Sequence, residues 1–116
     1  MPAESIAYQK ALSFAKRIVN LCRHLASEHH DYVLSNQILR SGTSIGANIA
    51  EARCAFSRKD FAAKIYIALK ECAETLYWLE LLYITDYLSE AEYLSLREDC
   101  ELLRRMLSAT TRSLRS

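Results

Sequence analysis

A chain of 116 residues, 51% of them hydrophobic and 25% charged, has the size and composition of one soluble globular domain, which excludes the disordered and fibrous classes. The formal net charge is only +1, so the composition lacks the strongly basic balance that would by itself indicate nucleic acid as the partner. Two glycines and one proline are too few for the many turns of a sheet, and we therefore expect long helices.

The first predicted helix carries two neighbouring apolar stripes. Apolar residues that step by four and three lie along one face of a helix. The first stripe is Ala7, Ala11, Phe14, Ile18, Leu21 and Leu25, and the second is Tyr8, Leu12, Ala15, Val19, Cys22 and Ala26. One helix cannot bury so wide a face alone, so the pattern is typical of a helical bundle. A polar break from Glu28 to Asp31 ends this helix.

The second predicted helix, from Leu34 to Ala52, has small residues in its middle. A glycine inside a helix costs about 1 kcal/mol relative to alanine, so Gly42 and Gly46 require compensation. A phosphate-binding loop is one alternative, but its Gly-Lys-Ser/Thr ending is missing. Gly42, Gly46 and Ala50 lie at four-residue steps on nearly one face. We therefore predict a helix-packing seam, where a neighbouring backbone approaches closely.

Two polar residues, Asn48 and Glu51, lie three positions apart beside this seam. Buried amide and carboxylate groups must find hydrogen-bond partners or cost a few kcal/mol each. We hypothesise that the two residues form a buried polar pair that holds the register of the helix against its neighbours.

The third and fourth predicted helices begin at Ser-x-x-acid motifs, Ser57 with Asp60 and Ser89 with Glu92. Their apolar stripes are Phe61, Ile65, Ala68, Cys72, Thr75, Leu79 and Leu82, and then Leu96, Cys100, Leu103, Leu107, Thr110 and Leu114. Connections of a few residues make neighbouring helices antiparallel. The expected fold is all-α, an antiparallel up-down-up-down four-helix bundle, with residues 1–116 as one domain.

Two stretches, Gln37–Ala52 and Asp60–Leu79, carry a family resemblance. They resemble bacterial four-helix bundle proteins related to those encoded in intervening sequences of 23S ribosomal RNA genes. The resemblance implies a cytoplasmic bundle that assembles as a ring-like homopentamer, with no established enzymatic activity. Some relatives look like retroelement accessory proteins that associate with nucleic acid, but those are markedly basic, whereas this chain is close to neutral.

Self-association is also favoured by a third stripe on the third predicted helix, about 110° from its core stripe. This stripe contains Ile67, Trp78 and Leu81 among glutamates. A large aromatic side chain on an acidic outer face is typical of an interface anchor, so we predict an oligomer interface at these three residues. The alternative is that Trp78 covers a groove between two helices of the same chain.

Charge is distributed unevenly along the chain. Residues 65–103 hold two Lys or Arg against nine Asp or Glu, whereas residues 1–64 and 104–116 are each net basic. Oppositely charged segments favour docking between copies, and solvated helix faces are the alternative. The basic residues are also weak candidates for phosphate contacts to RNA or DNA. These candidates are Lys10, Lys16, Arg17, Arg23, Arg104, Arg105, Arg112 and Arg115.

No residue pattern predicts catalysis, a cofactor, a metal or a small-molecule substrate. The Glu-x-x-His pairs of bundle metal sites do not occur, and the three histidines gather near one turn. The four cysteines form no Cys-x-x-Cys pair and are expected to be small buried hydrophobes. No apolar run is long enough to span a bilayer, and no charged-then-apolar leader occurs, so we expect a cytoplasmic protein without membrane contact. We predict a non-catalytic, self-assembling oligomeric scaffold or partner-binding module, with an RNA-associated accessory protein as the alternative.

Overall fold

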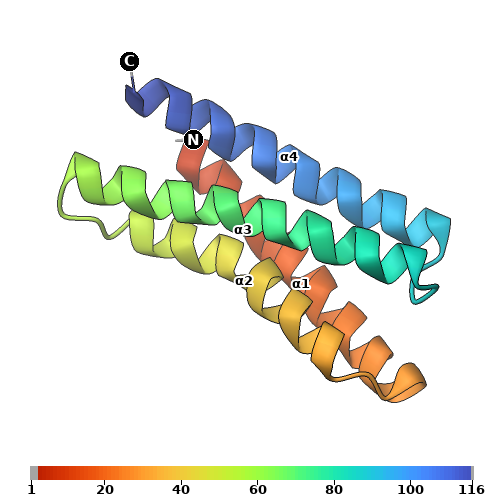
Figure 1. The fold of residues 1–116 in the computed structure, drawn as a ribbon. Helices are drawn as coiled ribbons and strands as arrows, with labels where there is room; N and C mark the ends of the chain where they lie inside the picture. The colour runs from red at the N-terminus through yellow and green to blue at the C-terminus, as the bar shows by residue number, and fades with distance from the viewer. Residues whose placement is uncertain (1–2, 116) are drawn as a thin grey trace.

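The computed structural model describes residues 3–115, which form four α-helices joined by short connections. These are α1 (Ala3–His29), α2 (Val33–Ala52), α3 (Arg58–Ile84) and α4 (Glu90–Arg115). Consecutive helices run in opposite directions in an elongated body of 45 × 21 × 21 Å (Figure 1). The described range contains no strand, and the predicted all-α antiparallel bundle is confirmed. The predicted domain limits at residues 1 and 116 lie outside this range.

The starts of α3 and α4 are stabilised by side chains that accept hydrogen bonds from free backbone N–H groups. The Ser57 hydroxyl accepts from the Asp60 N–H at 3.0 Å. At the start of α4, the Ser89 hydroxyl accepts from the Glu92 N–H at 3.1 Å, and the Glu92 carboxylate accepts from the Ser89 N–H at 3.0 Å. This reciprocal pair satisfies two N–H groups that the helix itself leaves unpaired. The predicted boundaries at these residues are therefore confirmed.

One hydrophobic core runs along the bundle and takes the inward stripe of each helix. Among the described residues, three polar side chains are buried with it, Ser35, Ser41 and Thr75. The Thr75 hydroxyl donates to the Ser41 oxygen at 2.9 Å, which links α3 to α2. The second stripe of α1 is only partly enclosed, because Leu12 is 53% exposed at the outer edge of α1 and α2. Apolar patterning therefore overestimated how much of α1 faces the core.

The small residues of α2 face α1. A Cβ atom added at Gly42 would lie 3.0 Å from both Cγ atoms of Ile18, whereas one added at Gly46 would lie 3.5 Å from the Cβ of Ala11. Ala50, one turn further along, is half-buried. The close approach of α2 to α1 therefore requires the absence of a side chain at Gly42, whereas at Gly46 a methyl group would fit in ordinary contact.

Candidate functional site

The side of α3 that points away from the core is largely apolar. We define the outer face of α3 as the exposed row opposite the buried stripe, in which Lys70 and Glu80 interrupt five apolar residues: Ala63, Tyr66, Ala73, Tyr77 and Ile84. Tyr77 is 58% exposed and Ile84 is 66% exposed. A helix that is apolar on both sides is usually enclosed on both, so this face is a candidate interaction surface.

The three residues predicted from the sequence to form an oligomer interface lie closer to α2 than this face does. Ile67, Trp78 and Leu81 are each half-buried. Trp78 packs against the core and donates its Nε1–H to Glu74 at 2.9 Å. Glu74 also contacts Arg40 of α2. Trp78 therefore covers the junction of α2 and α3, which was the alternative interpretation.

Sequence reasoning missed Tyr66, Tyr77 and Ile84. Leu81 is the residue that links the predicted set to the outer face, because it lines a shallow hollow with Tyr77 and Ile84. The Tyr77 ring also meets the Trp78 ring edge to face, with centroids 4.9 Å apart. The available signal was a second apolar stripe opposite the first, which a search centred on the single Trp did not reveal.

The hypothesis of a buried polar pair is wrong for Glu51. Its side chain is 59% exposed and pairs with Lys64 of α3 at 2.9 Å. The same hydrogen bond from Lys64 to Glu51 raises the pKa of Lys64. Asn48 is half-buried and donates to the Ser44 carbonyl of its own helix at 2.8 Å. Both side chains lie at the edge of α2, between its core-facing side and its solvent-exposed side.

The candidate phosphate contacts do not form one continuous patch. Arg17 is held by Asp99 at 2.7 Å, and Arg104 is held by Glu101 at 2.9 Å. The remaining six side chains are exposed along α1 and α4, and they are Lys10, Lys16, Arg23, Arg105, Arg112 and Arg115.

The turn between α2 and α3 brings further cations to the C-terminal end of α4. Arg58 donates to the Leu114 carbonyl at 3.4 Å. Lys59 of α3 and Arg115 of α4 lie on either side of one shallow apolar groove. Phe56 lies in this turn and is 93% exposed. We call the group Arg53, Arg58, Lys59, Arg112 and Arg115 the basic end.

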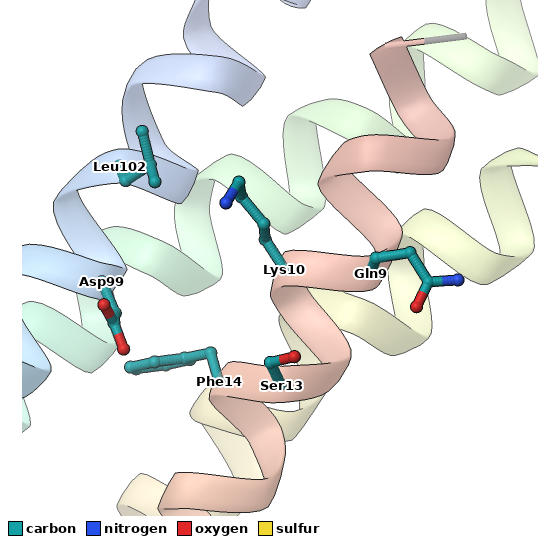
Figure 2. Close-up of a pocket in the computed structure, with 6 residues that line it drawn as sticks. All are labelled: Gln9, Lys10, Ser13, Phe14, Asp99 and Leu102. Atoms are coloured by element: carbon teal, nitrogen blue, oxygen red, sulfur yellow. The ribbon is translucent and has the colours of Figure 1, made fainter. Parts of the chain in front are cut away.

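A pocket of about 320 Å³ opens between α1 and α4. Figure 2 shows the Lys10 amine reaching into the gap beneath Leu102, with the Phe14 ring and the Asp99 carboxylate at its other side. Ser13 and Gln9 complete the lining, although the Gln9 side chain points away from the gap. The Phe14 ring is fully buried, so the floor of the pocket is the hydrophobic core.

A comparison with known protein families identifies the family of this chain. The model of the family described as 23S rRNA-intervening sequence protein matches residues 3–109. The chain belongs to this family. The resemblance seen in α2 and α3 is therefore confirmed over most of the chain.

A solved structure supports the same assignment. The chain is 48% identical to a protein of unknown function from the S23 ribosomal protein family of Bacteroides thetaiotaomicron, known from a crystal structure. The match covers 96% of this chain and 99% of the other, with a TM-score of 0.93. No curated protein matches the sequence. Family membership thus identifies the fold and relatives of unknown function.

The cysteines of this family member differ in exposure. Cys54 is exposed near the basic end, and the other three are buried. Burial raises the pKa of the Cys22 thiol to about 11. The hydrogen bond between Cys100 and Cys72, together with burial, raises the pKa of Cys100 further. The Cys22 and Cys100 thiols are therefore poor nucleophiles.

Residues 3–115 contain no group of three or more His, Cys, Asp or Glu side chains placed to hold a metal ion. Within the same range, no helix combines the length and hydropathy required to cross a membrane.

Proposed function

We propose that this family member is a non-catalytic helical bundle that self-assembles into a homo-oligomer, a pentamer as the family resemblance implies, and serves as a scaffold or partner-binding module. The observation that carries this proposal is the outer face of α3. Its exposed tyrosines and Ile84 form an apolar surface on a helix whose opposite side already fills the core. Removing such a surface from water favours association.

A second copy of the chain is the occupant that the charges favour. The acidic segment, residues 65–103, includes most of α3 and the first half of α4. The net basic segments are α1, residues 53–64 at the turn before α3 and its first turns, and the end of α4. One copy therefore offers both halves of a complementary pair, and a head-to-tail contact of this kind closes into a ring when the rotation permits.

Light scattering on a gel-filtration column tests the assembly. We expect the wild-type chain to elute with a mass several times that of the protomer, and the double variant Tyr77→Glu with Ile84→Glu to elute as a monomer. Leu94→Glu is the matched control, because Leu94 is an exposed apolar residue of α4 and not part of the outer face of α3 as defined above. A monomeric wild type, or a double variant that assembles like the control, would refute the proposal.

A second candidate function, association with RNA, is favoured by the basic end. The exposed Phe56 lies in the turn that also holds Arg53, Arg58 and Lys59, and a basic surface with an aromatic side chain suits single-stranded nucleic acid. The family's description also refers to ribosomal RNA. We expect RNA oligonucleotides to bind at low salt, and Arg58→Ala with Lys59→Ala to weaken that binding. Equal affinity for this variant and the wild type would exclude the basic end as the contact.

A further inference from the structure

The pocket between α1 and α4 exists because this pair of helices is joined less tightly than its neighbours. α1 and α4 make the sparsest contact of the adjacent helix pairs in the bundle. At the positions of α1 that face α4, the chain has Ser13 and Lys10 in place of bulky apolar residues. A serine leaves volume unfilled, and a lysine extends its ammonium group away from the core. The result is a hollow with an apolar floor at Phe14 and an apolar wall at Leu102.

The charges around this hollow leave one cation without a partner. Arg17 donates to the Asp99 carboxylate at 2.7 Å and to the Ser95 hydroxyl at 3.0 Å, so the only acid lining the pocket is already neutralised. Lys10 forms no ion pair among the described residues. With Arg17 counted, the surroundings of the pocket have a net charge of one positive unit, and the Lys10 amine lies on the Leu102 side of the gap, across from Phe14 and Asp99 (Figure 2).

We propose that the α1/α4 pocket is a binding site for a small amphipathic carboxylate. The apolar tail of the ligand lies against Leu102, above the buried Phe14, and its carboxylate pairs with the Lys10 ammonium. A volume of about 320 Å³ lies at the small end of the range for ligand pockets, which suits a short aliphatic chain or a single ring.

The arrangement disfavours other classes of ligand. A cationic amphiphile would place its charge near Lys10, and an uncharged one would form no ion pair with the exposed Lys10 ammonium. A ligand with several negative charges, such as a nucleotide, would place its additional charges near Asp99. Only a single negative charge matches the single unpaired cation.

The test uses octanoate as the probe and octylammonium as the probe of opposite charge, both below the concentration at which they form micelles. Backbone amide shifts of the full-length chain report where each probe binds. We expect octanoate to give saturable shifts in residues 9–14 and 99–102, and octylammonium to bind there about tenfold more weakly or not at all. Shifts confined to the outer face of α3, or equal binding of both probes, would overturn the proposal.

Two variants of α1 test the polar and apolar halves of the site separately. Lys10→Met keeps the aliphatic stem and removes the charge, so octanoate affinity should fall about five- to tenfold. Lys16→Met is the matched control, because Lys16 is also an exposed lysine of α1 but does not line the pocket, and its affinity should equal that of the wild type. If Lys10→Met and Lys16→Met bind octanoate with equal affinity, the assignment of Lys10 to the site is refuted.

Ser13→Trp tests the pocket itself, because an indole at this exposed position fills the hollow without entering the core. Octanoate binding should be lost while the helical circular dichroism and the oligomeric mass stay at wild-type values. Retained octanoate binding by folded Ser13→Trp would show that the ligand lies elsewhere. Because the mass is measured in the same samples, failure of this site is distinguishable from failure of the proposed self-assembly.

Discussion

Alanine substitutions at the two glycines of α2 should change stability in opposite directions. Each substitution removes the conformational cost of an interior glycine, which is worth about 0.5–1 kcal/mol. At Gly46 the new Cβ would lie in ordinary contact with Ala11, at 3.5 Å, so Gly46→Ala should stabilise the bundle by nearly this full amount.

At Gly42 the new methyl group would press on a neighbour that cannot move aside. Its Cβ would lie 3.0 Å from both Cγ atoms of Ile18, which is fully buried. Ile is branched at Cβ and its χ1 is stiff, so relief requires a shift of α1 against α2. Overpacking of this kind costs about 1–3 kcal/mol. After subtracting the helix-propensity gain, Gly42→Ala should destabilise the bundle by about 0.5–2 kcal/mol.

Chemical denaturation followed by far-ultraviolet circular dichroism measures both changes, at equal protomer concentration because assembly adds to apparent stability. A double-mutant cycle identifies the cause. In an Ile18→Ala background both Cγ atoms are absent, so Gly42→Ala should become stabilising there. If Gly42→Ala is as stable as Gly46→Ala in the wild-type background, the close approach of α2 to Ile18 is refuted.

Three further predictions concern a buried hydroxyl, a capping carboxylate and an exposed thiol. Thr75→Val should cost about 1–2 kcal/mol in denaturation experiments, because it removes the donor to Ser41, and an unchanged midpoint would contradict this. The Ser89 N–H lowers the pKa of Glu92 from its ordinary 4.5, so the carboxylate stabilises the fold above that pH and the contribution disappears as pH falls through the lowered value. Glu92→Gln should therefore lower stability by about 0.5 kcal/mol at neutral pH and converge with the wild type in acid. A chromogenic disulfide reagent should modify one thiol per folded chain rapidly, and Cys54→Ser should abolish that phase.

Much of the fold is encoded locally in the sequence. The apolar stripes of α1 and α3 recur every three or four residues, and this spacing predicts both the helices and their buried sides. The starts at Ser57 and Ser89 are equally local, since a cap and its N–H partner lie three residues apart. Because the connections are short, consecutive helices must run antiparallel, and the four helices form an antiparallel bundle.

The candidate surfaces were less predictable, because periodicity assigns a side of a helix but not the neighbour that covers it. Ile67 and Trp78 lie on a real third stripe, yet α2 encloses much of it and leaves Tyr77 outside. Glu51 lies beside the glycine seam, yet it faces Lys64 at the rim of α3. One step of about 100° around a helix separates a buried position from an exposed one, and pattern alone does not resolve it.

The sequence by itself determined the helices, their core stripes, their caps and the family, because each depends on residues close together in the chain or on motifs within one helix. Only the tertiary structure decided which groups from distant segments meet. The Arg17 and Asp99 pair joins residues 82 positions apart, and this pair leaves Lys10 as the unmatched cation of the α1/α4 pocket. The distance between α1 and α4, and hence the hollow between them, is set by the packing of all four helices together.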